Sequence, residues 1–144
     1  MTGIAITLSP DYGWVVMVVV STFFMLMWLG IRVGKARKQY DVKYPKMYAE
    51  PFNHTFNCIQ RAHQNTLEGY PSFLVLLLLG GLLYPRLSAV AGAVWVAGRV
   101  AYALGYSTGD PGKRQYGAFG YFGLFTLLGI NIMFGLKLLG YMSW

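Results

Sequence analysis

The stretch that decides the fold runs from Tyr12 to Ile31 and reads YGWVVMVVVSTFFMLMWLGI. None of its side chains is charged. A helix of about 20 apolar residues is long enough to span the hydrocarbon core of a bilayer. No Lys or Arg precedes this run, so it lacks the basic segment of a cleavable signal peptide. We therefore expect it to remain as the first membrane helix.

Three further apolar segments follow it. Residues 69–85 and 115–136 are uncharged, and residues 87–109 contain a single charge, on Arg99. Of the 144 residues, 56% are hydrophobic and 12% are charged, against about 25% charged in a soluble domain. Runs this long and continuous argue against barrel strands, which alternate and are about ten residues long. The sequence thus predicts an all-α membrane protein, an up-down bundle of four transmembrane helices.

The whole chain, residues 1–144, is expected to form this one domain. The expected helices are 11–38, 54–84, 87–108 and 114–142. Small residues within the third and fourth helices, including Gly98, Gly120 and Gly123, are typical of helices that approach each other closely in a membrane.

The basic residues predict how the bundle is oriented. Residues 32–46 hold six Lys or Arg side chains, and Lys113 and Arg114 add two more in the third loop. The opposite side has only Arg86 and Lys137. Because basic loops stay in the cytosol, loops one and three should be cytosolic and both termini lumenal. The net charge of +7 is then explained by the orientation of the protein in the membrane, and it gives no reason to expect a nucleic-acid partner.

The second helix begins with the motif FNCIQRAHQNTLE at residues 56–68. Within it Arg61, Asn65 and Glu68 are spaced i, i+4, i+7 and share one helix face. Ionisable groups at membrane depth normally face a cavity or a partner. A cation, an amide and an anion on one stripe would suit a zwitterionic, peptide-like ligand. The alternative is an ion pair between Arg61 and Glu68 with no role in binding.

The third helix repeats this pattern, with Arg99, Tyr102 and Tyr106 at i, i+3, i+7. Tyrosines alone are common at membrane interfaces. Arg99, however, lies well inside the helix and needs a partner, for which Glu68 is a candidate.

The single cysteine, Cys58, excludes an internal disulfide. A catalytic role together with His63 is an alternative to an inert, buried thiol. His54, His63 and Cys58 do not have the spacing of a known metal site, so we expect no metal.

The motif at residues 56–68 resembles the signature of the membrane-associated proteins in eicosanoid and glutathione metabolism, the MAPEG family. The stretches KARK (35–38), YPKMY (44–48) and GYSTGDPGKR (105–114) point within it to the microsomal glutathione S-transferase type 3 branch. The resemblance covers nearly the whole chain. It implies a homotrimer that binds glutathione between neighbouring subunits on the cytosolic side. It also implies a membrane of the endoplasmic reticulum, or the outer mitochondrial membrane or nuclear envelope.

The resemblance further implies roles for individual residues. The glutathione contacts of the family fall on Arg37, Arg61, His63, Asn65, Glu68, Tyr102 and Tyr106. The arginine that stabilises the thiolate falls on Arg114, if the loop has one extra residue, and Lys113 is its rival. Lys38 stands where an arginine acts on the second substrate, and Gly69 stands where some members have a tyrosine contact.

The activity implied is conjugation of glutathione to lipophilic electrophiles, reduction of lipid hydroperoxides, or formation of leukotriene C4. The hydrophobic substrate would arrive from the bilayer. Two alternatives remain: a non-catalytic lipid-binding scaffold of the same family, and a small channel or transporter lined by Arg61, Glu68 and Arg99. The presence of Arg37 and Arg114 argues against the scaffold.

Overall fold

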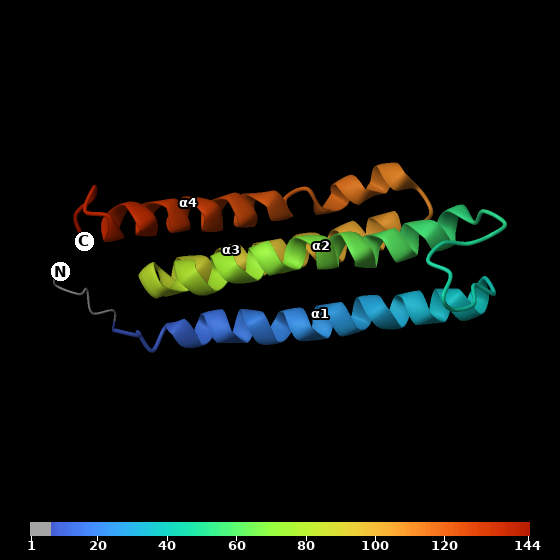
Figure 1. The fold of residues 1–144 in the computed structure, drawn as a ribbon, viewed down its shortest axis with the longest axis horizontal. Coiled ribbons are helices and arrows are strands. Elements are labelled where there is room, and N and C mark those ends of the chain that lie inside the picture. Colours follow the sequence, from blue (N-terminus) through green and yellow to red (C-terminus); the bar gives the residue numbers. More distant parts are fainter. Residues whose placement is uncertain (1–6) are drawn as a thin grey trace.

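The computed structural model describes residues 7–144, which form helices and contain no strand. The elements are α1 (Tyr12–Gln39), α2 (His54–Leu83), α3 (Pro85–Tyr106), the 3-10 helix η1 (Pro111–Gly117) and α4 (Gly120–Leu138) (Figure 1). All four α-helices are long and apolar enough to cross a membrane. The prediction of an all-α membrane bundle with four spanning helices is confirmed.

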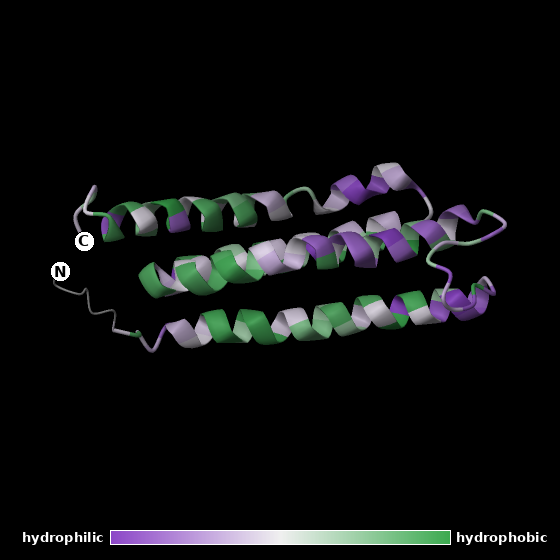
Figure 2. Cartoon of the chain, viewed as in Figure 1, coloured by the Kyte–Doolittle hydropathy of each residue, from purple (hydrophilic) through white to green (hydrophobic). Residues whose placement is uncertain are grey.

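The helices run alternately up and down, so the connections divide between two ends. Figure 1 shows the start of α1, the C-terminus and the α2–α3 turn at one end, which we call the termini end. The α1–α2 loop and the α3–η1 connection lie at the other, the loop end. Hydrophilic residues gather toward the loop end, whereas the helices near the termini end are mostly hydrophobic (Figure 2).

Short local signals set the boundaries of α2 and α3. The side chain of Asn53 accepts a hydrogen bond of 2.8 Å from the backbone N–H of Phe56, which caps the start of α2. A single residue, Tyr84, separates α2 from α3. Pro85 opens α3, a position where its missing N–H costs no hydrogen bond.

The fourth helix differs from the expected range of 114–142. Asp110 accepts a hydrogen bond from the backbone N–H of Gly112 at 2.9 Å, and a 3-10 helix follows. The α-helix begins only at Gly120 and ends at Leu138. Gly140, with φ of 81°, follows the end of this helix in the left-handed conformation that glycine adopts most readily. The basic pair Lys113–Arg114 therefore lies in η1, before α4.

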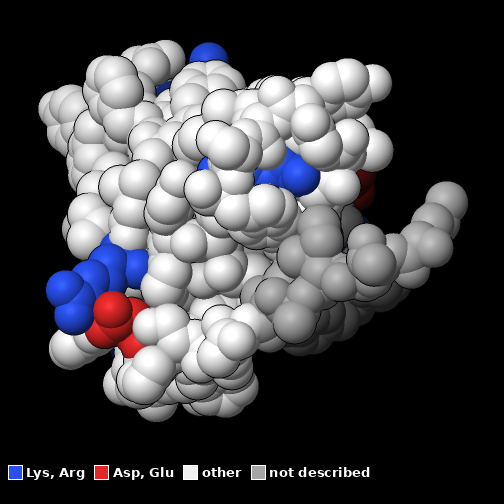
Figure 3. All heavy atoms as spheres, turned by 90° about the vertical axis from the view of Figure 1, so that its left-hand side faces the viewer, with Lys and Arg blue, Asp and Glu red and all other residues white. Residues whose placement is uncertain are grey.

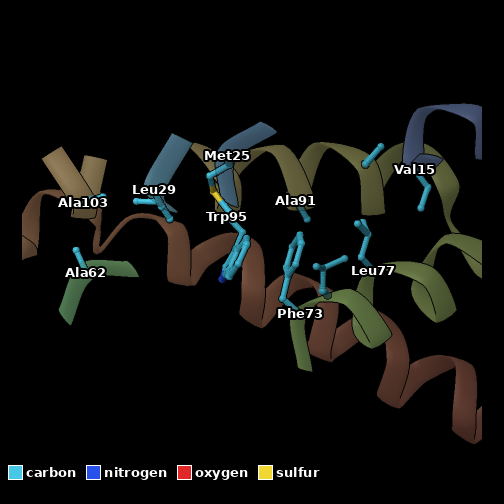
Figure 4. Close-up of a cluster of buried hydrophobic side chains, with 11 residues drawn as sticks. Val15, Met25, Leu29, Ala62, Phe73, Leu77, Ala91, Trp95 and Ala103 are labelled. Carbon is cyan, nitrogen blue, oxygen red and sulfur yellow. The ribbon is translucent and has the colours of Figure 1, made fainter. Parts of the chain in front are cut away.

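Aromatic and aliphatic side chains fill the centre of the bundle. Phe73 of α2 stacks on Trp95 of α3 with ring centroids 3.8 Å apart, and both are buried (Figure 4). Leu77 of α2 and Leu127 of α4 are fully buried in the same cluster. Asn131 ties α4 to α2 by donating a hydrogen bond of 2.8 Å to the carbonyl of Leu76.

Glycines bring α3 into backbone contact with η1 and α4. A Cβ atom at Gly123 would overlap the carbonyl oxygen of Ala91, and one at Gly117 would overlap the carbonyl oxygen of Gly98. At Gly105 it would overlap the carbonyl oxygen of Lys113. This α3–α4 seam is the close approach that small residues predict. It presses η1 against the last turns of α3 and so positions Arg114.

Candidate functional site

A pocket of about 270 Å³ opens near the loop end, between α2, α3 and η1. We call it the polar pocket. Its main lining residues are Arg61 and Asn65 from α2, Arg99, Tyr102 and Tyr106 from α3, and Arg114 from η1. Three guanidinium groups thus surround one space, which favours an anionic ligand.

A chain of hydrogen bonds joins the polar residues of α2 and α3. Arg61 Nη1 donates to Glu68 Oε1 at 2.8 Å, and Nη2 donates to Oε2 at 3.2 Å. Asn65 Nδ2 donates to Glu68 Oε2 at 3.5 Å, and Asn65 Oδ1 accepts from Arg99 Nη2 at 2.8 Å. The ion pair considered as an alternative therefore exists. Its side chains are 37% and 49% exposed, so it is of low energetic worth and accessible to a competing ligand.

The expected pairing of Arg99 with Glu68 is wrong. Arg99 instead donates from Nε to Thr66 Oγ1 at 3.1 Å and from Nη2 to Asn65 and Thr66. Its guanidinium carbon also lies 4.1 Å from the ring centroid of Tyr102. The carboxylate of Glu68 is instead paired with Arg61 on its own helix.

Sequence reasoning missed Thr66, which holds Arg99 in place. Its hydroxyl donates to the carbonyl of Ala62 at 2.9 Å and accepts from Arg99, so this buried hydroxyl is used both as a donor and as an acceptor. Thr66 is adjacent to Asn65 but points off the Arg61 stripe. Only the packing of α3 against α2 identifies it.

The two tyrosines and Arg114 complete the polar pocket. The rings of Tyr102 and Tyr106 meet edge to face, 5.5 Å apart. Arg114 lines the pocket with them, whereas Lys113 is not among the lining residues. The expectation that Arg114 lies at the N-terminus of the fourth helix is wrong, because Arg114 lies within η1, and the rest of η1 and two further residues separate it from α4.

Arg37 and Lys38 lie in a different place within the chain. With Lys35 and Lys43 they line a second pocket of about 510 Å³ at the loop end of α1. Arg37 is buried and donates from Nη1 to the carbonyl of Lys46 at 2.8 Å. Within one chain, Arg37 therefore holds the α1–α2 loop and does not line the polar pocket.

His63 is also outside the polar pocket. It follows Arg61 by two residues, so it points to another side of α2, where it is half-buried. One chain thus brings together Arg61, Asn65, Tyr102, Tyr106 and Arg114, with Glu68 attached through Arg61. No group of three or more His, Cys, Asp or Glu side chains within residues 7–144 is placed to hold a metal ion.

Residues 15–134 match the model of the MAPEG family. The chain belongs to the MAPEG family. The matched span of this MAPEG protein includes every lining residue of the polar pocket.

Three relatives illustrate the range of similarity. Microsomal glutathione S-transferase 2 of Homo sapiens is 35% identical over 107 residues, which cover 71% of this chain and 69% of that protein. The Bos taurus protein of the same name is 33% identical over 107 residues, covering 71% and 70%. A probable microsomal glutathione S-transferase of Dictyostelium discoideum is 25% identical over 118 residues, covering 76% and 77%. The type 3 assignment within the family stays a prediction.

Proposed function

We propose that this MAPEG protein is a membrane-embedded transferase that conjugates glutathione to lipophilic electrophiles. The observation that carries the proposal is the convergence of Arg61, Asn65, Tyr102, Tyr106 and Arg114 on one pocket beside Glu68. Glutathione has two carboxylates, one ammonium and one thiol. Arg61 would bind a carboxylate and Glu68 the ammonium, so binding replaces their mutual ion pair with contacts to the ligand.

Arg114 is the residue that would activate the thiol. A free thiol has a pKa of about 8.5, and its thiolate is the nucleophile. A guanidinium close to sulfur favours the charged form and lowers this pKa. The thiolate then attacks an electrophilic carbon to form a C–S bond. The leaving group departs with the bonding electrons or, for an epoxide, the C–O bond opens and its oxygen takes a proton.

A homotrimer would complete this site. The polar pocket of one chain, about 270 Å³, is slightly smaller than the roughly 300–1,000 Å³ of typical small-molecule sites. Arg37, Lys38 and His63 lie outside it. Both features support a binding site shared between subunits. In that arrangement Arg37 and His63 would contact a glutathione held by the neighbouring chain, and Lys38 would face the second substrate.

The basic loops support a cytosolic location for the polar pocket, in the endoplasmic reticulum or a related membrane. Labelling in sealed vesicles tests the orientation. In a Cys58→Ser background, Lys43→Cys should react with an impermeant reagent from the cytosolic face, and Met142→Cys from the lumenal face. Labelling of both from the same face would contradict the orientation.

A turnover assay on the purified protein tests the activity. Glutathione is supplied with an aryl halide, a lipid epoxide or a lipid hydroperoxide in parallel. We expect thioether formation with the first two. With the hydroperoxide, the thiolate would attack the O–O bond to give an alcohol and a sulfenic acid, which a second glutathione converts to disulfide and water. Disulfide formation would thus assign a peroxidase activity.

Assays on the same purified protein distinguish the remaining alternatives. No turnover in any assay, with no thiolate absorbance from bound glutathione, would indicate a lipid-binding scaffold instead. Solute or ion flux in liposomes would indicate a channel or transporter.

A further inference from the structure

An apolar groove lies between α1 and α3 at the termini end of the bundle, with a volume of about 500 Å³. Its walls are Trp14, Met17 and Ser21 of α1 and Ala89, Val90 and Ala93 of α3, with Arg86 at one end. The groove exists because short alanine side chains on α3 face longer side chains on α1. Trp14, Met17 and Val90 are all about half or more exposed, so the groove opens sideways, away from the bundle core.

An ion pair marks the mouth of this groove. Arg86 Nε lies 2.9 Å from Asp11 Oδ2, and the Arg86 side chain is 78% exposed, so most of its guanidinium is accessible. The end of the molecule seen in Figure 3 is largely uncharged, with one place where basic and acidic atoms adjoin. Arg86 is the second residue of α3, and Tyr84 and Trp14 lie near it. Tyr and Trp at helix ends are typical of the headgroup level of a membrane.

We propose that this groove binds a zwitterionic phospholipid of the leaflet at the termini end. One acyl chain lies against Met17, Val90 and Ala93, and Arg86 binds the phosphate as a planar fork. Asp11 faces the ammonium of the headgroup, so each member of the ion pair gains an opposite charge. An anionic headgroup such as that of phosphatidylglycerol carries the same phosphate but no ammonium to neutralise Asp11, which selects zwitterionic over anionic lipids.

The groove is separate from the polar pocket. Arg86 and Tyr106 are at opposite ends of α3, 20 residues apart in the sequence, and a helix rises about 1.5 Å per residue, or roughly 30 Å over this distance. A phospholipid headgroup at Arg86 therefore lies on the other side of the membrane core from Arg114. The lipid is a bound component of the protein and does not serve as the electrophile, and the inference does not depend on the transferase activity.

Fluorescence quenching with a brominated lipid tests this proposal. Trp14 reports on the groove once Trp28→Phe and Trp144→Phe remove two other emitters, leaving Trp95 buried in the core. Phosphatidylethanolamine brominated on its acyl chains is titrated into the protein in detergent. We expect saturable quenching of Trp14 at one lipid per chain, and weaker affinity for brominated phosphatidylglycerol.

Variants locate the binding site. Ala93→Leu narrows the groove and should weaken binding by about tenfold, as expected when roughly two methylene groups lose their burial. Ala97→Leu, one turn further along an exposed face of α3, is the matched control and should bind as the parent does. Arg86→Gln should weaken binding by roughly two- to fivefold, as for an exposed ionic contact. Because Arg86 is exposed, this variant keeps the test valid if Ala93→Leu fails to fold.

Three outcomes would overturn the proposal. Quenching that never saturates, or that is equal in all variants, would show only general contact with lipid. Tighter binding of phosphatidylglycerol would contradict the role of Asp11. Absence of quenching by either lipid would mean that another chain covers the groove.

Discussion

At the termini end the helices meet mainly through apolar side chains and bare backbone, whereas toward the loop end polar side chains also join α3 to α2. Gly123 lets α4 lie against the carbonyl of Ala91 near the start of α3. Toward the other end of the same helix, Arg99 crosses to α2 and bonds to Asn65 and Thr66. Helix α3 is thus held against α4 by close packing in one half and joined to α2 by hydrogen bonds in the other.

Because of this difference, the contacts that hold the bundle together are distinct from the polar groups that a ligand can reach. Lipid tails are as apolar as the helices, so close packing, rather than the hydrophobic effect, holds helices together within a membrane. The backbone contact at Gly123 offers no charged pair with which a ligand could exchange. At the loop end, Arg61 and Glu68 are partly exposed, and their charged groups are bonded to each other, with Asn65 also donating to Glu68. A charged ligand can therefore replace these contacts. Substitutions in the two halves should therefore have different consequences.

The largest effect is expected in the seam. Gly123→Leu places a side chain where even a Cβ atom would overlap the Ala91 carbonyl, so α3 and α4 must separate. Overpacking costs about 1–3 kcal/mol or more, and here the obstacle is backbone that cannot rotate away. We expect loss of monodisperse protein in size-exclusion chromatography. Gly129→Leu, also in α4 but with open space around it, is the control and should behave as wild type. Equal behaviour of the two variants would show that the seam is not tightly packed.

At the loop end, Arg114→Ala should slow the chemistry strongly without affecting the fold. Arg114 is exposed and makes no contact in the seam, so the thermal midpoint should stay unchanged. Each unit by which Arg114 lowers the thiol pKa changes the thiolate fraction by up to about tenfold. We expect turnover to fall by about tenfold or more and the thiolate absorbance of bound glutathione to disappear near neutral pH.

Lys113→Ala is the matched control for Arg114→Ala and should change turnover little, because Lys113 does not line the polar pocket. If the two variants exchange these results, Lys113 is the activator and the alignment of the loop is wrong.

A smaller, selective effect is expected for Glu68→Gln. The amide keeps the shape of the side chain but loses the charge that would bind the ammonium of glutathione, so KM for glutathione should rise sharply while kcat changes less. A glutathione analogue without its amino group should bind wild type and variant equally. Glu50→Gln, in an exposed ion pair with Lys46, is the control. Unchanged glutathione affinity in Glu68→Gln would assign the Arg61–Glu68 pair a purely structural role.

The sequence predicted features that depend on neighbours along one helix. Uncharged runs gave the four membrane helices, and i, i+4 spacing placed Arg61, Asn65 and Glu68 on one face. Features that depend on how helices pack were not predictable in this way. The partner of Arg99 is set by the position of α3 against α2, which places Thr66 closer than Glu68. The 3-10 helix around Arg114 lies against α3 through the contacts of Gly105 with Lys113 and of Gly117 with Gly98, which periodicity does not reveal.

Arg37 is a charged residue at the loop end that holds the α1–α2 loop of its own chain. Its Nη1 donates to the carbonyls of Val42 and Lys46, and its guanidinium carbon lies 4.3 Å from the ring centroid of Tyr44. Arg37→Ala leaves these carbonyls without a donor, at a cost of about 1–3 kcal/mol. The thermal midpoint measured without glutathione should therefore fall, whereas Lys38→Ala, the exposed neighbour, should leave it unchanged. If Arg37→Ala melts as wild type does but raises KM for glutathione, then Arg37 faces the ligand of a neighbouring subunit instead of its own loop.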